Sequence, residues 1–228
     1  MRLGLQGALS ELYAHLLELE GLVERILSLA VDSLKARDPA MAKAVVDSDD
    51  AIDDLASKIE EEAIRVIALH QPVGSDLRRI IGTIRVSIDL ERIADLAVNI
   101  AEVVPELSRQ PLLKPLIDIP RMMVIAQEML HDGLNALRDG DTELARQVCL
   151  RDDEIDHLYL RIFHELVSFI TEDPTTTSRA VPLLFVARHL ERVGDHATNI
   201  AEIVFYQKTG RRIRLRDIMD PREEQGSR

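Results

Sequence analysis

Carboxylate side chains recur in this sequence as pairs spaced four residues apart. On an α-helix each residue advances by about 100°, so the two members of such a pair share one face. Like charges at this spacing destabilise a helix by a few tenths of a kcal/mol, and a bound cation would reverse that effect. The four pairs are Asp49 with Asp53, Glu91 with Asp95, Asp152 with Asp156, and Glu191 with Asp195.

The ligand type in these pairs indicates which ion they would bind. Carboxylate and amide oxygens suit Mg, Ca, Mn or iron rather than a soft-ligand zinc site, and four carboxylates from two adjacent helices could hold more than one ion. Further oxygen ligands follow on the same helix face as Glu91 and Glu191. These second-rank candidates are Asn99, Glu102, Asn199 and Glu202.

The pairs belong to an internal duplication. The string ERIADLAVNIAE from Glu91 returns as ERVGDHATNIAE from Glu191, with eight of twelve positions identical. VVDSDDAIDDL from Val45 likewise matches VCLRDDEIDHL from Val148. Each half therefore carries one pair on its second expected helix and one on its third, which predicts two equivalent metal sites.

Helices must position these residues. Only 3% of residues are aromatic, and long segments carry apolar residues at intervals of three and four, which favours helix over sheet. Turn signals at Asp38-Pro39, Gln71–Gly74, Asp139–Asp141 and Asp173-Pro174 divide each half into three helices. We therefore predict an all-α protein of two tandem three-helix bundles related by a pseudo-twofold. The expected boundaries are 1–104 for the first bundle, 105–120 for a proline-rich, non-helical linker, 121–208 for the second bundle, and 209–228 for a basic then acidic tail.

Charge and composition exclude several classes of protein. A formal net charge of -12 repels phosphate backbones, so we expect no nucleic-acid partner. The single Cys149 forms no internal disulfide, no secretory leader precedes the first helix, and charges interrupt every apolar run. We therefore expect a cytoplasmic protein without a membrane span.

Other interpretations of the same residues remain open. The acids could form a solvated face of a purely structural bundle, with Arg92 and Arg192 at its edge. DDAID and DDEID also match the DDxxD motif with which prenyl diphosphate synthases hold magnesium diphosphate, although their supporting arginine pairs and deep cavity are not indicated here. Glu154 and His157 make one ExxH, whereas a ferritin-like di-iron site needs two.

Two further features indicate little about function. His196 has Leu96 as its counterpart in the first half, which excludes a symmetric ligand role and makes a surface or helix-contact histidine the expectation. The tail RRIRLRDIMDPREEQGSR could touch anionic lipid or a partner, although a solvated terminus is the simpler expectation.

On these motifs, from about residue 6 to residue 208, the sequence resembles the PhoU family of phosphate-signalling proteins. The resemblance implies a cytoplasmic, non-enzymatic adaptor of high-affinity phosphate uptake that negatively regulates the phosphate regulon. It implies contacts with the transporter's ATPase subunit and a sensor histidine kinase, and a homodimer is expected. It also implies multinuclear metal clusters on the eight paired acids, with iron favoured and manganese or magnesium as alternatives. The sequence contains no nucleophile or general-base constellation, which agrees with a protein that is not an enzyme.

Overall fold

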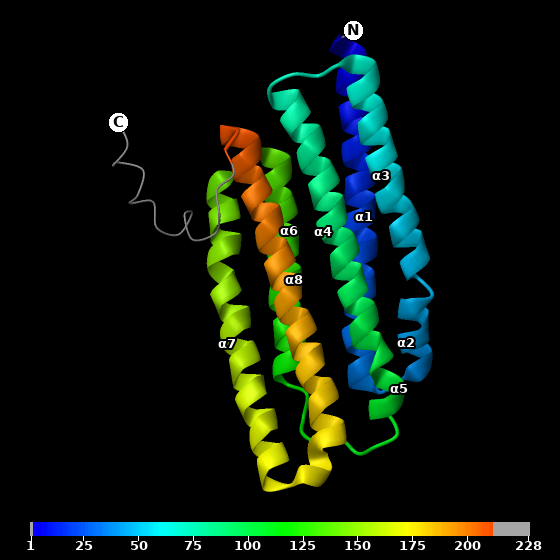
Figure 1. Cartoon of the computed structure of the whole chain (residues 1–228), viewed down its shortest axis with the longest axis vertical. Coiled ribbons are helices and arrows are strands. Elements are labelled where there is room, and N and C mark those ends of the chain that lie inside the picture. The colour runs from blue at the N-terminus through cyan, green and yellow to red at the C-terminus, as the bar shows by residue number, and fades with distance from the viewer. Residues whose placement is uncertain (1, 212–228) are drawn as a thin grey trace, which may run out of the picture.

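The computed structural model describes residues 2–211, of which almost all lie in helices and none in a strand (Figure 1). Most of the predicted tail, including its arginine-rich segment after Arg211, lies outside the described residues. In chain order the elements are α1 (Arg2–Ala36), α2 (Pro39–Val46), α3 (Asp49–His70), α4 (Ser75–Glu102), α5 (Val104–Leu107), α6 (Asp118–Asp139), α7 (Thr142–Glu172), the 3-10 turn η1 (Pro174–Thr176) and α8 (Thr177–Thr209).

The predicted turn signals act as helix caps. The Asp38 carboxylate accepts hydrogen bonds from the Ala40 and Met41 amides at 2.8 and 3.3 Å, directly before Pro39. Asp141 caps α7 in the same way, and Gly140 closes α6 with φ 65°, a conformation that glycine adopts without strain. The turns that join the helices were therefore predictable from local chemistry.

One predicted helix of the first half is broken. Asp47 and Ser48 separate α2 from α3, whereas the second half runs without a break through the equivalent Leu150 and Arg151 in α7. The Ser48 hydroxyl donates to the Ala44 carbonyl at 2.6 Å, which offers the backbone an alternative to the helical pattern. The expectation of a continuous helix was wrong here, although the three-helix bundle is retained.

The segment between the halves is not wholly irregular. The short helix α5 covers its first residues, and α6 begins at Asp118, inside the range 105–120. Arg37 anchors the segment, since its guanidinium donates to the carbonyls of Leu107 and Ser108 at 3.3 and 2.8 Å.

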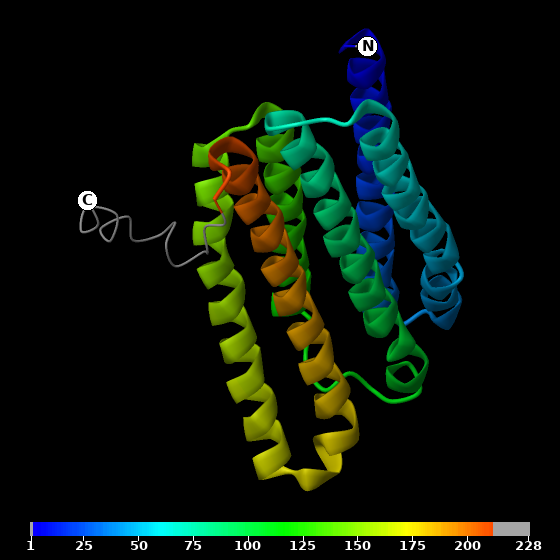
Figure 2. The same ribbon diagram turned by 45° about the horizontal axis from the view of Figure 1, so that its top comes forward.

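The central helices α4 and α8 join the two bundles. The helix α4 packs against α1, α3 and α8, and α8 packs against α6, α7 and α4. The two run in opposite directions in Figure 1, and Figure 2 shows the second bundle inverted beside the first. The two acidic regions lie on separate helix pairs, α3 with α4 and α7 with α8.

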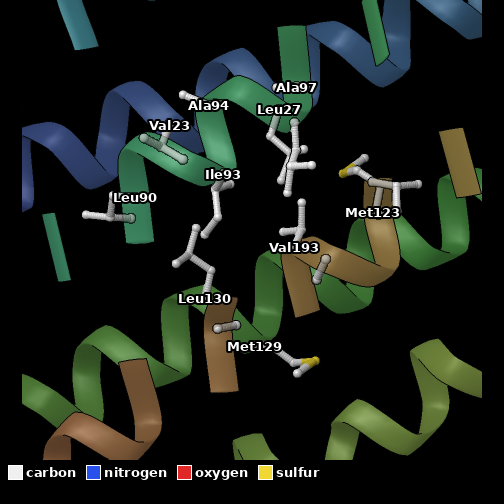
Figure 3. Close-up of a cluster of buried hydrophobic side chains, with 14 of the residues drawn as sticks. Val23, Leu27, Leu90, Ile93, Ala94, Ala97, Met123, Met129, Leu130 and Val193 are labelled. Atoms are coloured by element: carbon white, nitrogen blue, oxygen red, sulfur yellow. The ribbon is translucent and has the colours of Figure 1, made fainter. Parts of the chain in front are cut away.

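The bundles share one continuous apolar core. Figure 3 shows side chains of α1, α4, α6 and α8 converging, among them Val23, Ile93, Leu130 and Val193. The two tandem bundles therefore pack against each other through apolar side chains. None of the described helices combines the length and apolar composition that a membrane span requires.

Candidate metal centre

The first acidic site lies along the seam between α3 and α4, and we call it the α3–α4 site. It consists of Asp49, Asp53, Glu91 and Asp95. Buried Ile52 fixes the rotation of α3, and buried Ile93, Ala97 and Ile100 fix that of α4, as the helical phase predicted. Asp49 and the two acids of α4 are half-buried, while Asp53 is exposed.

Electrostatic coupling shows that the acids of α3 and α4 face one another. Burial raises the pKa of Asp49, and the charges of Asp53 and Asp95 raise it further. Desolvation followed by the charge of Asp95 likewise raises the pKa of Asp53. Since Asp95 is on the other helix, the two predicted pairs lie near enough for their charges to interact.

The second acidic site, the α7–α8 site, consists of Asp152, Asp156, Glu191 and Asp195. Desolvation raises the pKa of Asp152 to about 7, and the charges of Asp156, Asp195 and Glu191 add to the effect. Burial also raises the pKa values of Glu191 and Asp195. Asp152 therefore lies near enough to Asp156 and to the two acids of α8 for their charges to act on it, while Asp156 and Asp195 are exposed.

An arginine flanks each site. Arg92 Nη1 lies 3.0 Å from Asp95 Oδ2 in the α3–α4 site. In the α7–α8 site the partner is Arg188, which pairs with Glu191, rather than the expected Arg192. The repeat could not reveal Arg188, because its counterpart is Ile88. Its one sequence signal is the helical spacing of three residues to Glu191.

Two buried oxygens in these sites have no hydrogen-bond partner among the described residues. They are Asp49 Oδ1 in the α3–α4 site and Glu191 Oε2 in the α7–α8 site. Leaving a buried acceptor unsatisfied costs about 1–3 kcal/mol, more when it is charged. A cation or an ordered water would satisfy both oxygens. All the ligand atoms of these sites are oxygens, which suits a hard metal ion.

The spacing of the carboxylates bears on how they could bind ions. In the part of the chain that the structure describes, the three ligand atoms found within 4.8 Å of one another belong to Glu20, Glu24 and His131, not to either acidic site. Four like charges repel one another when no cation lies between them. Binding of a metal ion would therefore require these carboxylates to move closer together.

The second-rank candidates differ in position. Asn99 is half-buried, and Glu102 is exposed at the end of α4. Asn199 donates to Asp89 Oδ1 at 3.2 Å, in the α4–α8 contact. Glu202 lies close enough to Cys149 to help raise the pKa of that thiol to about 12, after burial and together with Asp152.

His196 is a helix-contact residue, as expected. Its Nδ1 lies 2.8 Å from Asp89 Oδ1 across the α4–α8 contact. The single ExxH is exposed, and His157 Nδ1 contacts the Asp153 carbonyl of its own helix at 2.6 Å. Between the aspartates of each DDxxD, Ile52 and Ile155 pack in the core. Neither motif therefore resembles an enclosed catalytic site.

Comparison with known proteins identifies related chains. The sequence model of the PhoU domain matches residues 16–104 and again residues 119–204. A protein of Clostridium acetobutylicum named "Phosphate-specific transport system accessory protein PhoU homolog" is 37% identical over 213 residues, covering 93% of this chain and 97% of that protein.

Solved structures agree with the sequence comparison. The crystal structure of PhoU from Pseudomonas aeruginosa is similar with a TM-score of 0.86 and 36% identity, covering 90% of this chain and 99% of that one. The phosphate transport system regulatory protein PhoU from Streptococcus pneumoniae gives a TM-score of 0.86 at 30% identity, covering 92% of this chain and 99% of that one.

Proposed function

The chain belongs to the PhoU family, and on that premise we propose that it is a regulatory accessory protein of a phosphate transport system. It acts by binding partner proteins, not by catalysing a reaction. The observation that carries this proposal is that both halves match the PhoU domain, while close relatives over nearly the whole chain are named accessory or regulatory proteins. The acidic sites supply ligands and arginines without a nucleophile, which supports binding over catalysis.

The proposed partners are the ATPase subunit of the transporter and a sensor histidine kinase. The protein would bind both on the cytoplasmic side of the membrane. Through them the protein restrains the phosphate regulon when phosphate is plentiful, and it does so as a homodimer. Exposed apolar side chains can mark a surface that binds another protein. Along α7 and α8 the exposed large side chains include Leu160, Phe163, Val167 and Phe185, which supports this role.

We further propose that the α3–α4 and α7–α8 sites bind metal ions, with iron favoured and manganese or magnesium as alternatives. The buried, unpartnered oxygens of Asp49 and Glu191 are the support for this step. The raised pKa values of Asp49, Asp53, Asp152, Glu191 and Asp195 support it too, because a cation would relieve the repulsion that raises them. In each bundle the metal ions would link the two helices that carry the ligands.

Partner binding is tested by affinity purification of the chain from cells grown in high phosphate. The transporter ATPase and the kinase should co-purify, and deletion of the gene should raise expression of phosphate-starvation genes. The double variant Phe163→Ser with Phe185→Ser changes exposed side chains only. It should fold normally but bind the partners more weakly. If neither partner co-purifies and deletion leaves that expression unchanged, the regulatory proposal is wrong.

Metal binding is tested by elemental analysis and titration of wild type and two double variants. Glu91→Gln with Asp95→Asn should lose the metal of the α3–α4 site and keep that of the α7–α8 site. Glu191→Gln with Asp195→Asn should do the reverse. Melting curves must show that both variants fold. A folded double variant with full stoichiometry would contradict the assignment of that site.

The alternative of a prenyl-synthase-type enzyme predicts a different result. Such an enzyme would consume an allylic diphosphate in the presence of magnesium and lose that activity in Asp49→Asn. A purely structural bundle would take up no metal and bind neither partner. The assays above therefore separate all three classes.

A further inference from the structure

A third group of metal-ligating side chains lies between α1 and α6, away from both acidic sites. Glu20 and Glu24 are one turn apart on α1, and His131 faces them from α6. His131 Nδ1 lies 3.8 Å from Glu20 Oε1 and 3.8 Å from Glu24 Oε1. One ligand atom from each of the three residues lies within 4.8 Å of the other two.

These separations are close to those in a metal site. Nitrogen and oxygen ligands lie about 2.0–2.2 Å from a zinc ion, so two ligands of a tetrahedral ion are about 3.4 Å apart. The 3.8 Å contacts would need to close by only a few tenths of an ångström. An open hollow lined by Glu24, Gln127, His131 and Arg151, among others, gives solvent access for a further ligand such as water.

The three side chains range from nearly buried to exposed, as is common for a metal site at the protein surface. The Glu20 side chain is only 13% exposed, Glu24 is 34% exposed and His131 is 60% exposed. Glu20 therefore anchors the group from the buried side, while the histidine closes it from solvent. Glu20 and Glu24 are one helical turn apart, so a cation between the two carboxylates would relieve their mutual repulsion.

The duplication supplies an internal comparison. With the offset of 103 residues that aligns Leu34 with Leu137, Glu24 corresponds to Gln127 and Ser28 corresponds to His131. The equivalent contact across the pseudo-twofold is thus a neutral one, in which Gln127 Nε2 donates to Ser28 Oγ at 2.6 Å. The position equivalent to Glu20 is Met123. The positions related by the pseudo-twofold therefore carry none of the three ligands.

We propose that Glu20, Glu24 and His131 form a third metal site, which binds a divalent transition metal such as zinc and ties the first bundle to the second. The imidazole sets this site apart, since nitrogen ligands favour zinc, copper, nickel or iron over magnesium and calcium. The ion would link α1 to α6 directly, in addition to the apolar core. This inference stands on its own geometry and holds whether or not the regulatory role or the acidic sites are established.

The other way to occupy this geometry is an ion pair between a protonated His131 and the two carboxylates. The two cases differ in what the ring nitrogen binds. In the ion pair Nδ1 carries a proton, and added zinc does not change the chemical shift of that nitrogen. In the metal site Nδ1 is deprotonated and bound to the ion, which gives a different nitrogen chemical shift.

The experiment is a titration of the chelator-treated full-length protein with zinc chloride, followed by NMR of protein labelled with nitrogen-15 in its histidine rings. His131→Gln assigns the resonances of His131, and its 60% exposed side chain can be replaced without disturbing the fold. We expect these resonances to shift to metal-bound values with one equivalent of zinc. Zinc in the all-carboxylate sites would bind no histidine nitrogen directly.

Matched variants complete the test. Glu20→Gln and Glu24→Gln keep the side-chain size and should each weaken the zinc response of His131 at least tenfold. Ser28→Ala, at the pseudo-symmetric position of His131, should leave it unchanged. The proposal is overturned if millimolar zinc leaves the His131 resonances unshifted, or if their response persists in the Glu20→Gln, Glu24→Gln double variant.

Discussion

The α3–α4 and α7–α8 sites carry matching carboxylates on equivalent helices, but Asp152 in the second is held further from water than its counterpart Asp49 in the first. Burial raises the pKa of Asp152 to about 7, a larger displacement than at Asp49. The other positions do not follow this order, since Asp195 is exposed and its counterpart Asp95 is half-buried. Duplication preserved the ligand types, while local packing sets the energy of each charge.

One backbone position accounts for part of this difference. Gly194 in α8 replaces Ala94 in α4, and a β-carbon at 194 would lie 3.0 Å from Asp152 Oδ1 and 3.0 Å from Ile155 Cδ1. The absence of that carbon lets α7 approach α8 at the site. The location of the acids adds to the effect, because Asp152 lies within a continuous helix whereas Asp49 begins one.

The strongest test of this packing is Gly194→Val. The branched side chain has no space between Asp152 and Ile155, so we expect a loss of about 2–3 kcal/mol in the free energy of unfolding. Gly21→Val is the control, since a β-carbon at Gly21 meets nothing within 4 Å. The control should change stability by less than about 0.5 kcal/mol in urea unfolding. Equal losses in both variants would mean that the close α7–α8 approach is not the cause.

Asp152→Asn tests the electrostatic side of the comparison, in metal-free protein. The folded-state pKa of Asp152, about 7, lies above its usual 3.8, so the folded state binds the proton more tightly than the unfolded state. Stability therefore falls as pH rises from about 4 to about 7 and is level above that. Three pKa units correspond to about 4 kcal/mol at most, and solvent contact reduces this to about 1–2 kcal/mol.

The asparagine variant should thus be more stable than wild type at pH 8 by about 1–2 kcal/mol and equal to it below pH 4. Urea unfolding at both pH values, with chelator present, measures this. Asp49→Asn should give the same sign with a smaller gain. With saturating metal the order should reverse, because wild type then gains the binding energy. A greater gain from Asp49→Asn than from Asp152→Asn would break the comparison.

The sequence predicted the parts of these sites that follow from helical geometry. The eight acids lie on the helices and faces that the spacing of four residues and the repeat predicted, beside core residues such as Ile93, and their role as metal ligands stays a prediction. It could not predict the unequal burial, because this depends on how closely two helices distant in the chain approach. The exchange of Ala94 for Gly194 removes a single methyl group, and only the contact with Asp152 shows its consequence.

Features without a repeat were missed for a related reason. The pairing of Arg188 with Glu191 has no counterpart in the first half, and the cluster of Glu20, Glu24 and His131 joins residues more than one hundred positions apart. Periodicity finds what each helix presents on its own face. It does not say which faces of different helices meet, and the α1–α6 contact is a case of that kind.

Arg188→Gln and Arg92→Gln test how the arginine beside each acidic site affects metal affinity. Each arginine repels an incoming cation and occupies a carboxylate that would bind it, so its removal should raise metal affinity. We expect about a threefold gain for Arg188→Gln, from a Coulomb energy of under ~1 kcal/mol near solvent, and a smaller gain for Arg92→Gln. Metal affinity is the measurement, since Arg188 also stacks 5.8 Å from the Tyr159 ring and its loss affects stability separately. Lower affinity in either variant would show that the arginine supports the site.

The smallest expected effect concerns the break between α2 and α3, directly before Asp49. Asp47→Ala with Ser48→Ala removes two side chains that compete with the helical backbone, and alanine has the higher helix propensity. The gain is partly offset by loss of the exposed pair between Lys43 and Asp47, which lie 2.6 Å apart. We therefore expect a net stabilisation of about 0.5 kcal/mol and a small rise in helical circular dichroism, because the first half then resembles the unbroken α7. The same variant should also bind metal slightly more tightly at the α3–α4 site, since Asp49 would no longer lie at a helix start.

The control for the lost ion pair is Arg146→Ala, whose pair with Glu143 is similarly exposed on α7 and whose loss should only destabilise the protein. If the double alanine variant destabilises the protein instead, the break is a required feature of the first half and not a product of local sequence alone.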